Sequence, residues 1–105
     1  MIDLSPGHLE IVKHILKSRA GGCEVWVYGS RVKGNARKYS DLDLVIKGKQ
    51  RIQQSVLLGL KDAFGESDLP FCVDVLDWDR ISDEFRKRIG EDYRVLLSVD
   101  DNQDK

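Results

Sequence analysis

The sequence has few cysteines and prolines, no surplus of charge of either sign, and no long hydrophobic run. Its 105 residues include 2 cysteines and 2 prolines, and the formal net charge is -1. A nearly neutral chain is unlike the strongly basic domains that coat nucleic acid, so we expect no direct nucleic-acid binding. The longest candidate stretches, residues 56–60 and residues 42–46 with Asp43 inside them, are far shorter than the roughly 18 apolar residues that a membrane span needs.

The two cysteines predict neither a disulfide nor a zinc site. Cys23 and Cys72 lie in separate apolar stretches, and neither has a second Cys or His at metal-binding spacing. We therefore expect two buried, reduced thiols. Residues 1–10 lack the basic and then apolar layout of a secretion signal. These features favour a cytoplasmic protein.

The composition, 41% hydrophobic and 33% charged residues, is typical of one globular domain. Residue patterns predict helices alternating with strands, which implies a small mixed β-sheet with helices packed against it, an α/β (α+β) fold. We expect this domain to span residues 1–99, followed by a polar tail at 100–105. The predicted helices cover residues 6–20, 53–64 and 80–89, the predicted strands cover 23–28, 41–46 and 71–76, and residues 93–99 fit either a strand or a helix.

Two common nucleotide-binding motifs are absent. No Gly-x-Gly-x-x-Gly follows the first predicted strand, which excludes a Rossmann dinucleotide site. No Gly-Lys-Ser/Thr occurs, which excludes a Walker phosphate loop.

The chemistry is concentrated between the first two strands. Asp41 and Asp43 are two residues apart on a strand, so their carboxylates share one face. Such a pair suits Mg²⁺, although an isolated Asp-x-Asp is more often a pair of solvated side chains. Gly29 and Ser30 directly follow the first strand, where a glycine permits close approach of a ligand and a serine offers a hydroxyl to phosphate.

A third carboxylate is expected from the strand over 71–76. Asp74 is the polar side chain of an otherwise apolar strand, and an ionised group there needs a cation or hydrogen-bond partners. Asp77 is the alternative, but it faces the other way at the end of the strand. We therefore expect Asp74 to converge with Asp41 and Asp43.

Gly29-Ser30, ten further residues and then Asp41-x-Asp43 resemble the hallmark of the DNA polymerase beta-like nucleotidyltransferase superfamily. The flanking residues are similar to the minimal nucleotidyltransferases (MNT), which include the antitoxins of HEPN–MNT toxin–antitoxin pairs. The likeness extends over most of residues 9–90 and implies the nucleotidyltransferase-type fold.

The resemblance implies an Mg²⁺-dependent transfer of AMP from ATP. Asp41 and Asp43 would hold two Mg²⁺ ions roughly 4 Å apart. Asp74 would ligate the ion nearer the attacking hydroxyl and help to take its proton. Gly29 and Ser30 would bind the β- and γ-phosphates.

Basic and aromatic side chains surround these positions. Arg31 and Lys33 could neutralise triphosphate charge, as could Arg37 and Lys38, although a solvated loop face is the more ordinary role for each. Tyr28 and Tyr39 lie next to the motif in the sequence and could contact the base of the nucleotide. Packing in the core is the more ordinary role for these tyrosines.

Few residues follow Asp74, so we expect a second chain to hold the acceptor. The resemblance implies a helical HEPN-type toxin as this partner, in a hetero-oligomer, with AMP transferred to one of its tyrosines. Two alternatives stay open. The chain could neutralise its partner by contact alone with a silent active site, or it could transfer a nucleotide to a small hydroxyl compound such as an aminoglycoside.

Overall fold

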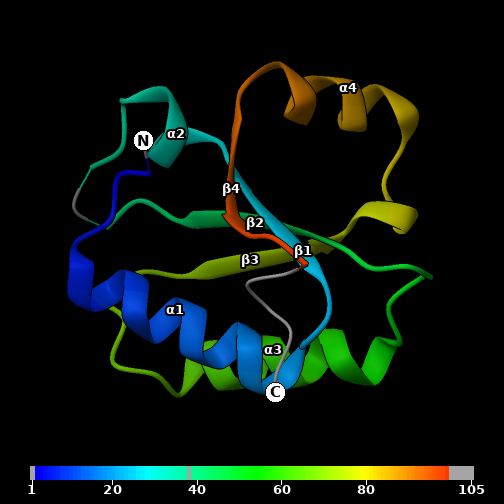
Figure 1. The fold of residues 1–105 in the computed structure, drawn as a ribbon. Coiled ribbons are helices and arrows are strands. Elements are labelled where there is room, and N and C mark those ends of the chain that lie inside the picture. Colours follow the sequence, from blue (N-terminus) through cyan, green and yellow to red (C-terminus); the bar gives the residue numbers. More distant parts are fainter. Residues whose placement is uncertain (1, 38, 100–105) are drawn as a thin grey trace.

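A computed structural model describes residues 2–37 and 39–99 (Figure 1). The polar tail expected at 100–105 lies outside the described residues. Helices and strands alternate in the predicted order. In chain order the elements are α1 (Pro6–Arg19), β1 (Glu24–Tyr28), α2 (Ser30–Lys33), β2 (Leu42–Lys47), α3 (Gln54–Gly65), β3 (Val73–Asp77), the 3-10 helix η1 (Trp78–Arg80), α4 (Asp83–Glu91) and β4 (Tyr93–Leu97).

The strands form one mixed sheet in the order β3-β2-β1-β4. β1 pairs antiparallel with both β2 and β4, whereas β2 and β3 run parallel. A mixed sheet with helices packed against it is the predicted fold class. Because β2 and β3 are parallel, both strands begin at the same end of the sheet, where β1 ends.

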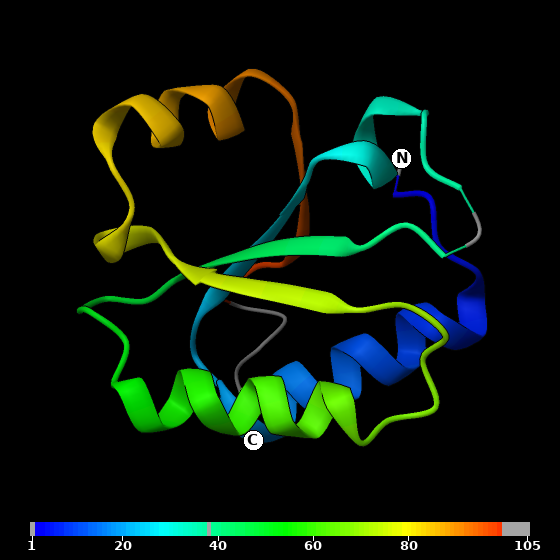
Figure 2. The same cartoon turned by 180° about the vertical axis from the view of Figure 1, so that it is seen from behind.

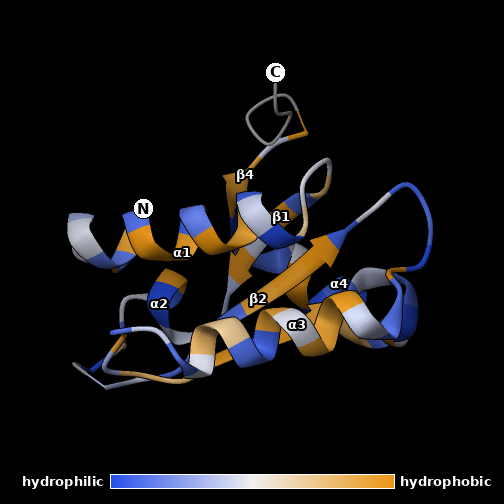
Figure 3. Ribbon diagram, turned by 90° about the horizontal axis from the view of Figure 1, so that it is seen from below, coloured by the Kyte–Doolittle hydropathy of each residue, from blue (hydrophilic) through white to orange (hydrophobic). Residues whose placement is uncertain are grey.

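Helices cover both faces of the sheet (Figures 1 and 2). α1 and α3 lie side by side across one face, and their hydrophobic sides are turned toward the strands (Figure 3). α4 lies on the opposite side of the sheet. None of the helices in the described part of the chain is long and apolar enough to cross a membrane.

Burial of alternate side chains fixes which way β2 faces. Leu42, Leu44 and Ile46 are fully buried in the core that α1 and α3 close. Burying each such side chain stabilises the fold by roughly 1.5–3 kcal/mol. A slip of one residue would move all three out of this core to the opposite face, so the register is strongly specified. Asp43 must therefore point to the other face, the one that α4 covers.

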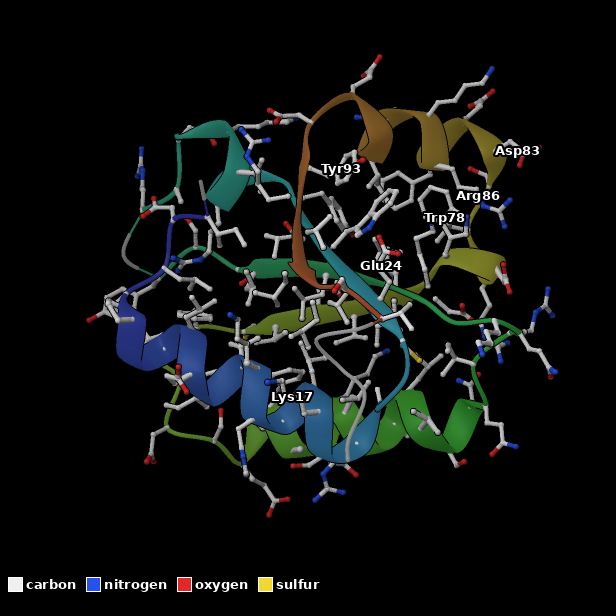
Figure 4. The ribbon with its side chains drawn as sticks, viewed as in Figure 1. Lys17, Glu24, Trp78, Asp83, Arg86 and Tyr93 are labelled. Atoms are coloured by element: carbon white, nitrogen blue, oxygen red, sulfur yellow. The ribbon has the colours of Figure 1, made fainter. Side chains whose placement is uncertain are left out.

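The α4 side of the sheet carries an aromatic layer, Trp26, Tyr28, Trp78, Phe85 and Tyr93, packed with Val45 and Ile89. Trp26 stacks on Tyr93 with ring centroids 4.0 Å apart and meets Trp78 edge-on at 5.2 Å. Trp78 and Tyr93 lie between α4 and the sheet (Figure 4). This layer anchors α4 above the strands.

The last helix begins later than the sequence predicted. Residues 78–80 form the 3-10 helix η1, and α4 starts only at Asp83. The Ser82 hydroxyl accepts a hydrogen bond from the Phe85 N–H, and such a capping contact sets the first turn of a helix. The sequence of residues 93–99 fitted either a strand or a helix, and in the structure residues 93–97 form the strand β4.

One expectation about the cysteines is wrong. Cys23 is partly buried, but Cys72 is exposed, and the two are not joined in a disulfide. Alternation along the extended segment before β3 explains this, because Phe71 takes the buried position and its neighbour Cys72 then faces outward. Hydrophobic neighbours in the sequence therefore did not imply burial for Cys72.

Candidate active site

The predicted site residues gather at the end of the sheet where β2 and β3 begin. Tyr28, the last residue of β1, pairs with Asp43 on β2. Asp43 in turn pairs with Asp74 on the parallel strand β3. Paired residues on adjacent strands project to the same face of a sheet. The topology therefore places Tyr28, Asp43 and Asp74 in a row on the α4 side.

Gly29 adopts a backbone conformation that few other residues can take. Its φ is 81° and its ψ is -153°, in a region that is nearly restricted to glycine. A Cβ added there would collide with the Asp43 carboxylate Oδ2 and lie 3.3 Å from its Cγ. The bend after β1 thus brings the main chain directly against the Asp43 carboxylate, as close approach by a glycine allows.

The Asp43 carboxylate is electrostatically crowded. Partial burial raises its pKa above the ordinary aspartate value, and the negative charges of Asp74 and Asp41 raise it further. Burial and like charge both disfavour the ionised form. The three predicted carboxylates are therefore close enough to interact, although Asp41 and Asp74 are individually exposed.

These carboxylates do not already form a metal-binding cage. Among residues 2–37 and 39–99, no group of three or more His, Cys, Asp or Glu side chains is arranged to hold a metal ion. The donors are hard carboxylate oxygens, the ligand type that Mg²⁺ prefers.

Tyr28 lies beside the carboxylates and is half-buried. Burial raises the pKa of its hydroxyl, and the charges of Asp43 and Asp74 raise that pKa further. The phenol therefore stays protonated at neutral pH. Its ring packs edge-on against Phe85 of α4, with centroids 5.8 Å apart. Tyr28 thus links the carboxylate end of the sheet to α4.

Arg31 occupies a different environment from the one expected of a phosphate ligand. It is only 6% exposed, and its guanidinium donates to the Ser40 carbonyl from Nε at 3.1 Å. The same group donates to the Asp3 carbonyl at 2.8 Å and lies 4.3 Å from the centre of the Phe71 ring. These contacts hold the loop before Asp41 against the amino-terminal segment.

Asp77, the alternative to Asp74 as the third carboxylate, is buried and holds backbone groups of other segments. It is 2% exposed, and its carboxylate accepts hydrogen bonds from the backbone N–H groups of Ile52 at 3.0 Å and Asp79 at 3.1 Å. Arg80 forms an ion pair with it at 3.2 Å. Asp77 therefore fixes the far end of β3, whereas Asp74 lies at the end with Asp43.

Two other residues near the motif are exposed. Tyr39 is 63% exposed, so packing in the core, the more ordinary role expected for it, is wrong. Tyr39 lies in the connection between α2 and β2 and is not part of the sheet. Lys33 is also exposed, at the end of α2.

A cavity of about 200 Å³ opens beside Gly29 on the α4 side, with Lys33 and Arg88 in its lining. Sequence reasoning did not single out Arg88. A signal was present, because Arg88 follows Phe85 by three residues and therefore shares its side of the helix. This spacing points to the site only when Phe85 is known to face Tyr28, which the sequence alone does not show.

Comparison with known proteins supports the resemblance to nucleotidyltransferases that the sequence indicated. A family model described as a nucleotidyltransferase domain matches residues 9–97. A protein of Haemophilus influenzae named "probable protein adenylyltransferase MntA" is 43% identical over 104 residues, which cover 99% of this chain and 91% of that protein.

Solved structures share the fold. A crystal structure of a toxin–antitoxin with AMP-PNP superimposes with a TM-score of 0.73 at 17% identity, over 90% of this chain and 77% of that chain. A structure of a tri-AMPylated Shewanella oneidensis HEPN toxin in complex with MNT antitoxin gives a TM-score of 0.63 at 14% identity, over 86% and 72% of the two chains.

Proposed function

This chain belongs to the nucleotidyltransferase domain family, and from this premise we propose that it transfers AMP from ATP to a hydroxyl group of a partner protein. The observation that carries the proposal is the row of Asp43 and Asp74 on adjacent strands, with the Gly29 main chain against the Asp43 carboxylate. A relative at 43% identity carries the name of a probable protein adenylyltransferase.

We assign Asp41, Asp43 and Asp74 as ligands of Mg²⁺, with two ions in the reacting complex. The crowding that raises the Asp43 pKa is the kind that a divalent cation relieves. Mg²⁺ commonly takes one or two protein carboxylates and completes its shell with water and substrate phosphates, so a preformed cage is not required. When bound, it would neutralise phosphate charge and acidify the attacking hydroxyl.

The residues of the chain then have separable tasks. Gly29 and Ser30 receive the β- and γ-phosphates, through backbone N–H groups and the Ser30 hydroxyl. Asp74 accepts the proton of the attacking hydroxyl. The hydroxyl oxygen forms a bond to the α-phosphorus, and the bond from that phosphorus to the leaving pyrophosphate breaks. Arg31 has no part in this assignment, because backbone carbonyls and an aromatic ring already hold its guanidinium.

The partner that fits this reaction is a helical HEPN-type toxin, with a tyrosine as the acceptor and the present chain as its antitoxin. Support comes from the solved complexes of the same fold, one with AMP-PNP and one with an AMPylated HEPN toxin. We place the reaction in the cytoplasm, where an exposed free thiol such as Cys72 stays reduced. Contact with nucleic acid has no role in this proposal.

Mass spectrometry of the partner tests the proposed function. The chain is mixed with ATP, Mg²⁺ and the protein encoded beside it in its genome, and the intact mass of that protein is measured. We expect an added AMP that disappears when Asp41→Asn and Asp43→Asn are combined. Asp62→Asn, which removes an exposed carboxylate from α3, is the control and keeps the transfer. A tight complex with an unchanged partner mass would instead establish a binding antitoxin.

A further inference from the structure

The cavity beside Gly29 lies between the β1–α2 connection and the last turns of α4. Tyr28, Gly29 and Lys33 line it from one side, and Phe85, Arg88 and Asp92 line it from the other. Tyr28 and Gly29 are also the residues that adjoin Asp43. The cavity therefore opens directly beside the carboxylates, on the same face of the sheet.

Two cations line the cavity from different elements, Lys33 from α2 and Arg88 from α4. Within the ranges 2–37 and 39–99, the side chains of Lys33 and Arg88 form no ion pair. The Asp92 carboxylate also lines the cavity, but it pairs with Arg94 at 3.5 Å. The lining thus presents two positive charges, from two separate elements, that form no ion pair within the described ranges.

Packing positions these cations relative to the site. Phe85 of α4 contacts Tyr28, and Ile89 next to Arg88 is buried in the aromatic layer. Arg88 therefore lies on a segment of helix that is fixed to the strand carrying Tyr28. Arg31, the basic residue nearest the glycine in sequence, is held elsewhere by Asp3 and Ser40.

The size and charge of the cavity select its ligand. Sites that enclose a drug-sized molecule measure about 300–1,000 Å³, so about 200 Å³ can hold only part of a nucleotide. Guanidinium and ammonium groups recognise phosphate through charge-assisted hydrogen bonds. We propose that Lys33 and Arg88 bind the terminal phosphates of ATP in this cavity, an inference that rests on the proposed function. Arg88 is then a specificity residue that distinguishes the triphosphate from AMP.

Binding measurements with neutralised cations test this assignment. Calorimetry compares ATP and AMP, each with Mg²⁺, on the full chain and on the variants Arg88→Gln and Lys33→Gln. Lys87→Gln is the matched control, because it removes the same charge from an exposed position of α4 that does not line the cavity. Arg88→Lys keeps the charge while changing the geometry of its donors.

We expect Arg88→Gln and Lys33→Gln each to weaken ATP binding about tenfold and to leave AMP binding unchanged. Lys87→Gln should match the unsubstituted chain, and Arg88→Lys should recover part of the ATP affinity. Equal weakening of ATP and AMP, or an Arg88→Gln effect no larger than that of Lys87→Gln, would overturn the phosphate site and leave the proposed function standing. Failure of the unsubstituted chain to bind ATP would overturn both.

Discussion

At the scale of single residues, Gly29 combines a demanding backbone conformation with contact to a carboxylate. Gly29→Ala would place a Cβ against Asp43 and force a side chain into a region nearly restricted to glycine. We expect a loss of about 1–3 kcal/mol in the free energy of unfolding, measured in urea, and a loss of ATP binding.

Gly34→Ala provides the control for backbone strain. Gly34 ends α2 with a φ of 85°, and a Cβ added there would meet nothing within 4 Å. We expect this variant to lose stability and to keep ATP binding. If both alanine variants bind ATP equally well, the contact of Gly29 with Asp43 has no part in the site.

The crowded Asp43 carboxylate predicts a pH-dependent cost to folding. Its pKa is raised in the folded chain, so the folded state holds the proton to a higher pH than the unfolded state does. Stability is therefore lost as pH rises above the unfolded value of about 3.9. We expect Asp43→Asn to be more stable than the unsubstituted chain at pH 7, although it should lose activity.

Urea unfolding at pH 7 and near pH 3 measures this difference. The advantage of Asp43→Asn should vanish at the lower pH, where both states of the natural residue are protonated. A variant that is less stable at pH 7 would show that the Asp43 carboxylate stabilises the fold, contrary to our account.

At the scale of elements, β3 carries two aspartates with different roles, one in the site and one in the stability of the fold. Asp74 is exposed at the end where the site lies, whereas Asp77 is buried at the other end and holds the backbone of Ile52 and Asp79. Removing a charged partner from buried hydrogen bonds costs about 1.5–3 kcal/mol. We expect Asp77→Asn to lower stability by about this amount and Asp74→Asn to leave stability nearly unchanged.

The effects of the same two variants on activity should be the opposite of their effects on stability. Asp74→Asn should abolish AMP transfer at a temperature where both proteins are folded, and Asp77→Asn should retain it. Thermal unfolding followed by circular dichroism, with transfer assayed below both transitions, checks the pair. Retained transfer in Asp74→Asn would remove this residue from the proposed mechanism.

At the scale of the whole molecule, local patterns predicted the order of elements because each helix and strand has its own periodicity and capping residues. A serine followed by a proline is typical of a helix start, and at the start of α1 the Ser5 hydroxyl accepts a hydrogen bond from the His8 N–H. The Asp-x-Asp spacing likewise indicated a shared face. These inferences needed only residues that are close in sequence.

The remaining features depend on contacts between distant segments, which one sequence does not reveal. Arg31 is buried because Asp3 and Phe71 lie next to it in space. The pairing of Asp43 with Asp74 depends on β2 and β3 being parallel neighbours. Arg88 reaches the site only because the aromatic layer fixes α4 over the sheet.

The central claim is that the carboxylates at this end of the sheet direct attack on the α-phosphorus of ATP. The most direct test incubates the chain, Mg²⁺ and the partner protein with ATP labelled at either the α- or the γ-phosphorus. Our account predicts that the α label becomes covalently attached to the partner and that the γ label leaves in pyrophosphate. Attachment of the γ label, or of neither label, would contradict it.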